Sequence, residues 1–286
     1  MKAVLDHDSI SVFAEGLDHS EGIAWGLDGY IYCGGEAGQI YKIDPDDRKV
    51  EVIANTGGFI LGLTLDGDNN IYACDSGHSV IQKISQNGKV VNYCTGAPGV
   101  PMILPNYPVF DRDGNLYIAD SGIWGKDEGK IFKILPGGKC EVWCDKLPEF
   151  PNGLCLDSDE EFLYVAMSLG PPRVSRVRIE KDGSAGAVET IMILEKTVPD
   201  GLAFDIEDNL YISCYRPDAI YRYTKDKQPQ LLAEDYEGTL ISAPTNIAFC
   251  GKNNEILLST NLGRWHLTKY DLGIKGRPLN YPKISG

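Results

Sequence analysis

The segments NGLCLD (152–157) and DGLAFD (200–205) belong to a motif that occurs six times along this chain of 286 residues. The other four copies are EGIAW (21–25), LGLTLD (61–66), NYPVFD (106–111) and TNIAF (245–249). Successive copies start 40, 45, 46, 48 and 45 residues apart. Five copies also have a tyrosine eleven or twelve positions after their first residue, namely Tyr32, Tyr72, Tyr117, Tyr164 and Tyr211. A period of this length indicates a repeat architecture.

Each copy has the pattern of four antiparallel strands. Turn pairs such as Asp28-Gly29 and Asp113-Gly114 separate the motif from a second β-rich run. A third run follows, such as QIYKID (39–44), and then a fourth, such as CEVWC (140–144). Four strands in about 45 residues are typical of a propeller blade. The sequence therefore predicts an all-β fold, a six-bladed β-propeller that forms a single domain over residues 1–286.

The N-terminal segment is expected to close the ring. The sixth copy lacks a fourth strand after LTKYDLG (267–273), whereas ISVFAEGL (10–17), ahead of the first copy, has the character of a fourth strand. Pairing of these two segments would complete the last blade and remove an open sheet edge. An open solenoid, the competing arrangement, would need capping repeats that the sequence does not contain.

Composition argues against several classes of function. The formal net charge of −14 disfavours binding to nucleic acid, whose phosphates need a basic surface. The sequence has no apolar run of 18 residues and no signal-peptide core, so we expect a soluble cytoplasmic protein without a membrane partner. The eight cysteines include no CxxC pair and are expected to be buried apolar residues. We expect a monomer or a small homo-oligomer that acts on a small molecule.

The first residues of the six copies predict a metal site. In a propeller the first strands line the central channel, and their starts share one mouth of it. These positions hold Glu21, Leu61, Asn106, Asn152, Asp200 and Thr245. Two carboxylates and two carboxamides suit a hard divalent cation. The absence of histidine and cysteine makes zinc or copper a poorer fit.

An alternative interpretation is that Asn-Gly and Asp-Gly are turn pairs, which would account for Asn152 and Asp200. It does not account for Glu21, because glutamate is no turn former, and Leu61 shows that the fold tolerates an apolar residue there. We therefore predict that Glu21, Asn106, Asn152 and Asp200 bind one divalent ion. We expect Ca²⁺, with Zn²⁺, Mg²⁺ and Mn²⁺ as alternatives.

These residues, in this order, resemble the senescence marker protein (regucalcin)/gluconolactonase family, which includes luciferin-regenerating enzyme. The resemblance covers essentially the whole chain, on motifs such as SEGIAW (20–25), PNGLCLD (151–157) and PDGLAFD (199–205). It implies a six-bladed propeller with one divalent ion at the channel mouth. The family's metal ligands correspond to Glu21, Asn152 and Asp200 of this sequence, and a pocket-lining asparagine corresponds to Asn106.

The chain departs from the family pattern in the third blade. Tyr107 and Pro108 stand where the family often has an acidic partner, and no arginine closely precedes Asn106. The resemblance therefore implies metal binding but does not by itself imply recognition of a sugar lactone. The intact set Glu21, Asn152 and Asp200 separates the chain from strictosidine synthase-like propellers, which do not require the metal.

The expected activity is metal-dependent hydrolysis of an ester, with a lactone as the expected substrate. The ion would polarise the carbonyl and stabilise the oxyanion. Asp200 is the candidate catalytic base, with His78 in reserve. The candidate substrate-binding residues are Phe59, Met102, Asn106, Tyr107, Trp124, Phe150, Tyr215, Arg216, Arg264 and Trp265. Two alternatives remain: a phosphotriesterase-like hydrolase that uses the same ion, and a non-catalytic calcium-binding or docking propeller.

Overall fold

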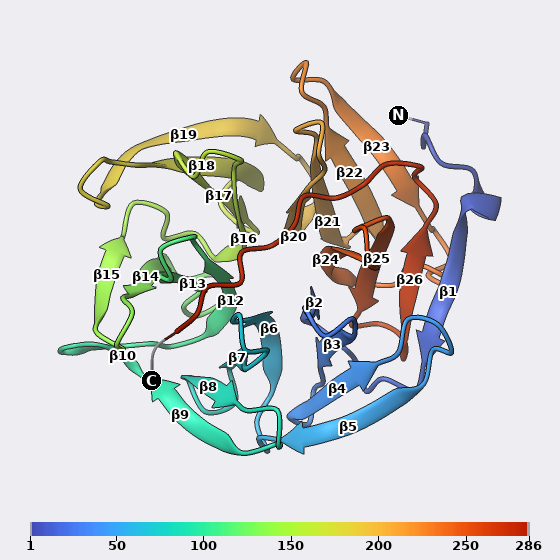
Figure 1. The fold of residues 1–286 in the computed structure, drawn as a ribbon. Helices are drawn as coiled ribbons and strands as arrows, with labels where there is room; N and C mark the ends of the chain where they lie inside the picture. The colour runs from blue at the N-terminus through green and yellow to red at the C-terminus, as the bar shows by residue number, and fades with distance from the viewer. Residues whose placement is uncertain (1, 285–286) are drawn as a thin grey trace.

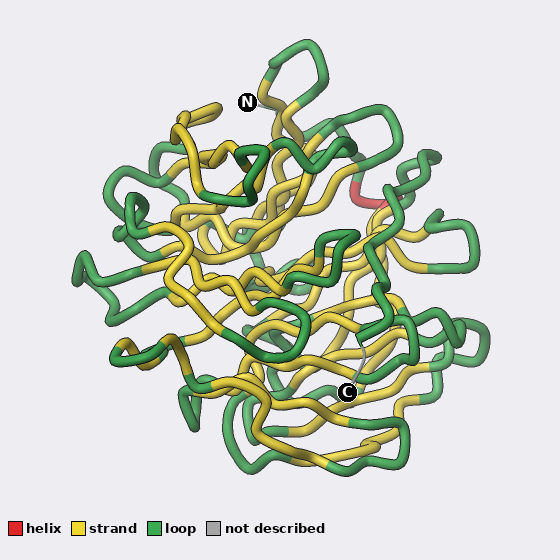
Figure 2. The backbone as a smooth tube through the Cα atoms, turned by 60° about the vertical axis from the view of Figure 1, so that its left-hand side comes forward, coloured by secondary structure: helices red, strands yellow, loops and turns green. Residues whose placement is uncertain are grey.

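The computed structural model describes residues 2–284 and arranges them as six four-stranded antiparallel sheets around a central axis (Figure 1). The predicted six-bladed β-propeller is confirmed. A small hairpin of β10 (Gly96–Ala97) and β11 (Val100–Pro101) follows the second blade. Helical structure within residues 2–284 is limited to the 3-10 turn His7–Ser9, and no helix there could cross a membrane (Figure 2).

The first three blades each consist of four strands that are consecutive in the chain. Blade one contains β2 (Ile23–Trp25), β3 (Ile31–Gly34), β4 (Gln39–Ile43) and β5 (Val50–Asn55). Blade two contains β6 (Ile60–Leu65), β7 (Ile71–Asp75), β8 (Val80–Ile84) and β9 (Val90–Cys94). Blade three contains β12 (Pro105–Phe110), β13 (Leu116–Asp120), β14 (Lys130–Ile134) and β15 (Cys140–Cys144).

The last three blades follow the same order except at the closure. Blade four contains β16 (Pro151–Leu156), β17 (Phe162–Met167), β18 (Arg173–Ile179) and β19 (Ala185–Ile193). Blade five contains β20 (Val198–Phe204), β21 (Leu210–Arg216), β22 (Ala219–Tyr223) and β23 (Pro229–Glu234). Blade six contains β24 (Pro244–Cys250), β25 (Ile256–Asn261), β26 (His266–Tyr270) and β1 (Ile10–Glu15).

The ring is closed both at its centre and at its edge. The first strand of each blade contacts the first strands of both neighbouring blades, so β2, β6, β12, β16, β20 and β24 form the inner wall. At the outer edge β1 pairs antiparallel with β26, from Ile10 opposite Tyr270 to Glu15 opposite His266. The predicted closure of the last blade by the N-terminal strand is confirmed.

The recurring tyrosine of the motif is explained by the hairpin that follows each first strand. Asp205 accepts hydrogen bonds from the backbone and side-chain nitrogens of Asn209 at 2.9 and 2.8 Å. The Tyr211 hydroxyl donates to the same carboxylate at 3.0 Å. In blade two Tyr72 donates to Asp66 at 3.2 Å in the same way. A buried tyrosine therefore packs in the blade while its hydroxyl fixes the turn.

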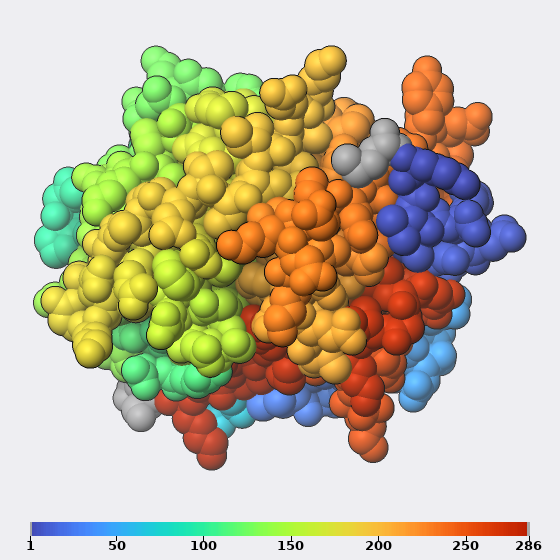
Figure 3. All heavy atoms as spheres, turned by 90° about the horizontal axis from the view of Figure 1, so that it is seen from above, coloured from blue at the N-terminus to red at the C-terminus, as the bar shows by residue number. Residues whose placement is uncertain are grey.

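A C-terminal strap, residues 275–284, crosses the centre of the ring in front of the blades in Figure 1 and lies along the lower side of the molecule in Figure 3. It hydrogen-bonds to the last residue of four first strands: Trp25, Phe110, Leu156 and Phe204. Its backbone also bonds to Gly67 of blade two and Asn254 of blade six. The strap thus contacts all six blades, and it covers the mouth at which the first strands end.

Candidate metal centre

Four of the six aligned side chains lie together at the mouth where the first strands begin. They are Glu21, Asn106, Asn152 and Asp200, which line one pocket of about 220 Å³. Their exposed fractions lie between 4% and 8%. Leu61 lines the same pocket, whereas Thr245 is fully buried behind it and donates to the backbone carbonyl of Glu21. The structure therefore brings the four predicted metal ligands together.

A break in strand pairing determines where three of these side chains lie. In blades three, four and five the register between the first and second strands shifts around Asn106, Asn152 and Asp200. Each residue follows a proline, which has no N–H to give to the ladder. A bulge of this kind redirects a side chain at the rim of a sheet. At the aligned position of the repeat, proline followed by Asn or Asp thus accompanies a bulge whose polar side chain lines the pocket.

The Asn-Gly and Asp-Gly pairs lie inside strands β16 and β20, so their interpretation as turn pairs is wrong. The glycine is needed because neighbouring first strands approach closely. A Cβ atom on Gly153 would collide with the carbonyl oxygen of Asp200, and one on Gly62 with the carbonyl oxygen of Asn106. The two glycines therefore permit the convergence that places the polar side chains side by side.

Two serines hold the amides of Asn106 and Asn152. The Ser121 hydroxyl accepts from Asn106 Nδ2 at 3.0 Å and donates at 2.7 Å to the backbone carbonyl preceding Asn152. Ser168 accepts from Asn152 Nδ2 at 3.2 Å and donates at 2.7 Å to the carbonyl preceding Asp200. Because each amide nitrogen is held by a serine, the amide oxygen is the end that remains for a ligand.

The polar atoms of the site fit a cation. Asn152 Oδ1 and Asp200 Oδ1 are buried and have no hydrogen-bond partner within residues 2–284. Burial, followed by repulsion from Asp200, raises the pKa of Glu21 well above its usual value. Burial also raises the pKa of Asp200 to about 7, against the lowering effect of the neighbouring Asn152 amide. Desolvated carboxyl groups and unpaired acceptor oxygens are what a hard divalent ion would stabilise.

Aromatic side chains form the outer wall of the pocket. Four predicted substrate-binding residues with aromatic rings line it, namely Phe59, Trp124, Phe150 and Tyr215, in addition to Asn106. Trp124, which is 57% exposed, meets Phe150 edge to face with ring centroids 4.8 Å apart. The sequence reasoning missed four further lining residues, Ser76, Leu104, Ser168 and Val198. Small polar and aliphatic side chains outside the aligned motif position have no pattern that would have identified them.

Two predicted substrate-binding residues lie inside the protein, away from this pocket. Met102 is 3% exposed and belongs to the apolar core between blades two and three. Tyr107 lines a different pocket at the far end of the channel. It follows Asn106 in β12 and therefore lies one residue deeper along the strand.

Three more predicted residues lie outside the pocket lining and contact other groups. Arg216 pairs with Asp218 at 2.8 Å, and Arg264 donates to a backbone carbonyl at 2.8 Å. Trp265 donates its indole N–H to His19 Nε2 at 3.0 Å. Among the residues that the structure describes, no lysine, arginine or histidine lines the pocket. The site therefore lacks the positive side chain that a carboxylate on the substrate would need.

The histidines near this mouth also lie outside the pocket. His78, the reserve base, places Nδ1 2.8 Å from Asp75 Oδ2, and its side chain is 49% exposed. His19 lies with Asp18 and Glu36 in a separate cluster, with Nδ1 3.1 and 2.9 Å from their carboxylates. Within residues 2–284 the carboxyl groups of the pocket lining are those of Glu21 and Asp200.

Comparison with known proteins identifies the family to which this chain belongs. The family model described as SMP-30/Gluconolactonase/LRE-like region matches residues 20–262. The chain belongs to this family. A curated family relative named lactonase drp35, from Staphylococcus haemolyticus, is 23% identical over 265 residues, which cover 88% of this chain and 81% of the relative. The gluconolactonase of Zymomonas mobilis is 25% identical over 300 residues, which cover 91% and 82%.

A solved structure shows the same fold. Regucalcin from Agrobacterium tumefaciens, described as a calcium-binding protein, superposes with a TM-score of 0.78 at 16% identity. The superposition covers 96% of this chain and 97% of regucalcin. The resemblance to the SMP-30/gluconolactonase family that the motifs indicated is confirmed.

Proposed function

We propose that this member of the SMP-30/gluconolactonase family is a divalent-metal-dependent lactonase, which opens a cyclic ester by attack of water. The proposal rests on the buried group of four oxygen-bearing side chains at one channel mouth, in which Asn152 Oδ1 and Asp200 Oδ1 lack a partner within residues 2–284. Two relatives carry the names lactonase and gluconolactonase, which supports a lactone as the substrate class.

Glu21, Asn106, Asn152 and Asp200 would hold the ion, which when bound would supply Lewis-acid stabilisation of the carbonyl oxygen and its oxyanion. We propose Ca²⁺ because all four donors are oxygen atoms, and the solved relative regucalcin is described as calcium-binding. The serine contacts to both asparagines fix the amide oxygens toward the pocket, so the donor set is organised before a ligand arrives.

The chain's own residues would bind the substrate and take up a proton. Asp200 is the candidate base, because it is one of two carboxylates in the lining and has an oxygen without a partner among the described residues. The rings of Phe59, Trp124 and Phe150 would cover the substrate and exclude bulk water. Because the wall carries no positive side chain in the described residues, we propose an uncharged lactone with an apolar substituent.

The test combines metal loading with two substrate panels. Chelator-treated protein would receive Ca²⁺, Zn²⁺, Mg²⁺ or Mn²⁺, and hydrolysis would be followed for neutral aliphatic lactones and for organophosphate triesters. We expect lactone hydrolysis with Ca²⁺, together with a metal-induced rise in Tm. Triester hydrolysis without lactone hydrolysis would indicate the phosphotriesterase alternative. Metal stabilisation with neither activity would indicate a non-catalytic calcium-binding propeller.

The variant Asp200→Ala tests the site directly. It should abolish lactone hydrolysis and the metal-induced rise in Tm, because it removes one of the two buried carboxylates. The variant His78→Ala serves as the comparison, since His78 lies outside the pocket and should be dispensable for both properties. Metal stabilisation that survives Asp200→Ala would show that the ion binds elsewhere.

A further inference from the structure

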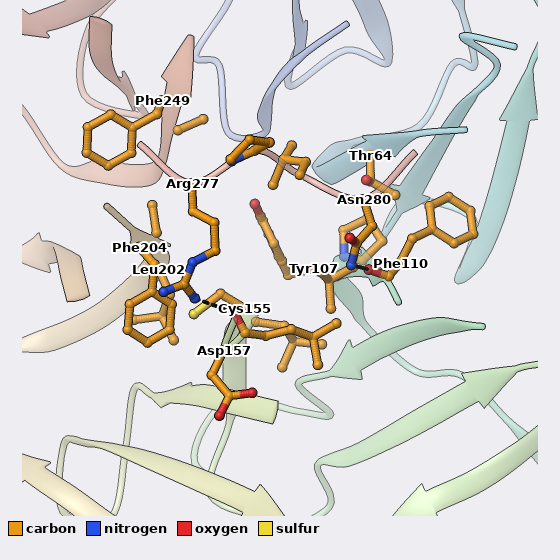
Figure 4. Close-up of a pocket in the computed structure, with 18 of the residues that line it drawn as sticks. Thr64, Tyr107, Phe110, Cys155, Asp157, Leu202, Phe204, Phe249, Arg277 and Asn280 are labelled. Carbon is orange, nitrogen blue, oxygen red and sulfur yellow. Dashed lines mark hydrogen bonds between the residues drawn. The ribbon is translucent and has the colours of Figure 1, made fainter. Parts of the chain in front are cut away.

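A second pocket, of about 300 Å³, lies at the opposite end of the channel beneath the C-terminal strap (Figure 4). We call it the far-mouth pocket. Its walls are formed mainly by apolar side chains near the ends of the first strands, including Leu63, Leu154, Leu202 and Ile247. Strap residues Arg277, Leu279 and Asn280 complete it. The pocket shares no lining residue with the candidate metal centre among the described residues.

Two hydroxyl groups face this pocket without a protein partner. Tyr107 and Thr64 are 7% and 5% exposed, and neither side-chain hydroxyl makes a hydrogen bond within residues 2–284. In Figure 4 the Tyr107 ring projects into the middle of the space, with Thr64 to one side. Neither oxygen is among the buried side-chain atoms that lack a partner, so both hydroxyl groups are accessible from the pocket and free to bind a polar group of a ligand.

The two arginines of the lining are paired with carboxylates. Arg277 pairs with Asp208 and lies 4.6 Å from the centroid of a phenylalanine ring. Arg112 lies 3.4 Å from the carboxylate of Glu160. Asp157 accepts a backbone hydrogen bond at 3.1 Å, and Figure 4 shows its carboxylate turned away from the space. Both arginines of the lining are therefore paired, and the carboxylate of Asp157, which has no cationic partner among the described residues, points away from the space.

We propose that the far-mouth pocket is a second binding site, for a small uncharged molecule with an apolar body and one hydroxyl or carbonyl group. The volume is at the small end of the range for ligand sites, about 300–1,000 Å³, which suits a single ring with a short substituent. The apolar walls bind the ring, and Tyr107 and Thr64 bind the oxygen. The site is separate from the metal centre and does not depend on the proposed lactonase activity.

The test uses three probes that differ only in their polar group: benzyl alcohol, toluene and benzoate. Binding to the metal-free protein would be measured by calorimetry and located by NMR shift changes of residues in the strap and in the first strands. We expect benzyl alcohol to bind about tenfold more tightly than toluene, which lacks the oxygen. Benzoate should bind most weakly, because its charge finds no partner.

Matched variants separate this pocket from the metal centre. Ala203→Phe fills the far-mouth pocket, and Val198→Phe places the same bulk in the pocket of the metal centre. Benzyl alcohol binding should be lost in the first variant and retained in the second. The opposite result, or binding unchanged by Ala203→Phe, would overturn the proposal.

A pair of near-isosteric variants covers the case in which Ala203→Phe does not fold. Tyr107→Phe and Thr64→Val remove the hydroxyl groups with little change in shape. Together they should reduce the affinity for benzyl alcohol about tenfold and leave toluene binding unchanged. Equal affinities in wild type and double variant, or a probe-soaked crystal in which the pocket holds only water, would contradict the assignment.

Discussion

Ser168 is a positioning residue that connects two candidate metal ligands in neighbouring blades. Its hydroxyl holds the amide of Asn152 and donates to the backbone just before Asp200. We predict that Ser168→Ala lowers metal affinity about 10- to 100-fold, the range typical of groups that orient metal ligands. Calorimetric titration with Ca²⁺ measures this loss.

Ser259 provides the control for that variant. It is also fully buried, and its hydroxyl bonds to Tyr270 in blade six, away from the metal centre. Ser259→Ala should lower stability without changing metal affinity. If the two variants changed metal affinity equally, the contact between Ser168 and Asn152 would have no positioning role.

The carboxyl groups of the metal centre predict an unusual pH dependence for the metal-free protein. Burial raises the pKa of Asp200 to about 7, whereas the unfolded chain titrates near 4. The folded state therefore retains a proton that the unfolded state has released, and stability falls as pH rises from about 4 to about 7. Urea unfolding of chelator-treated protein measures this trend, which Asp200→Asn should reduce. Stability that rose across this window because of Asp200 would contradict the burial argument.

The sequence could predict Glu21, Asn106, Asn152 and Asp200 because they occupy one position of a repeat, and the propeller makes such positions converge. The four aromatic residues of the pocket wall were also predicted, whereas Met102, Tyr107 and Trp265 were predicted for the same pocket and lie outside its lining. Trp265 illustrates the limit: its indole bonds to a loop histidine that comes close only after the ring has closed.

At the scale of elements, strand β1 joins the two ends of the ring. Phe13 of β1 is 4% exposed and packs in a core formed by blades one and six. We predict that Phe13→Ala destabilises the protein by about 3–5 kcal/mol, as is usual for loss of a buried phenylalanine. Urea unfolding measures the change in the free energy of unfolding.

Ser11, on the same strand, is exposed and pairs with Lys269 of β26. Ser11→Ala should change stability by less than about 0.5 kcal/mol. An equally small effect of Phe13→Ala would mean that β1 does not contribute to the core of the closed ring.

The strand order was predictable because β-rich runs and turn pairs repeat with the blade. The bulges at the channel mouth were not predicted, although proline precedes Asn106, Asn152 and Asp200. The sequence left turns as an alternative there, because Asn-Gly and Asp-Gly are also turn pairs. The close approach of the neighbouring strand decides between a turn and a bulge, as at Gly153. This approach is a tertiary contact, which a local sequence pattern does not contain.

At the scale of the whole molecule, the C-terminal strap links blades that are far apart in the chain. Asn280 Nδ2 donates to Phe110 O at 2.9 Å and to Glu160 at 2.7 Å, in blades three and four. We predict that Asn280→Ala destabilises the protein by about 1–3 kcal/mol and leaves metal affinity unchanged, because the metal centre lies at the other mouth. Thermal unfolding and Ca²⁺ titration measure the two effects.

Lys283, an exposed strap residue, gives the matched control, and Lys283→Ala should be close to neutral. A loss of metal affinity in Asn280→Ala would show that the two mouths are coupled. The strap itself could not be predicted, because residues 275–284 have neither strand alternation nor helical periodicity, and their partners exist only in the assembled ring.

The pairing of Ile10 with Tyr270 has a mechanical consequence. The start of β1 and the end of β26 lie next to each other. Tension applied to the two chain ends would therefore pull first on the hydrogen bonds at this end of the β1–β26 pair. The hydrogen bonds between β1 and β26 would then break one after another, starting at this end. Tension on the C-terminal end would first detach the strap from the channel mouth. We therefore expect two unfolding steps under tension: the strap detaches first, and β1 then separates from β26. The other five blades should remain folded.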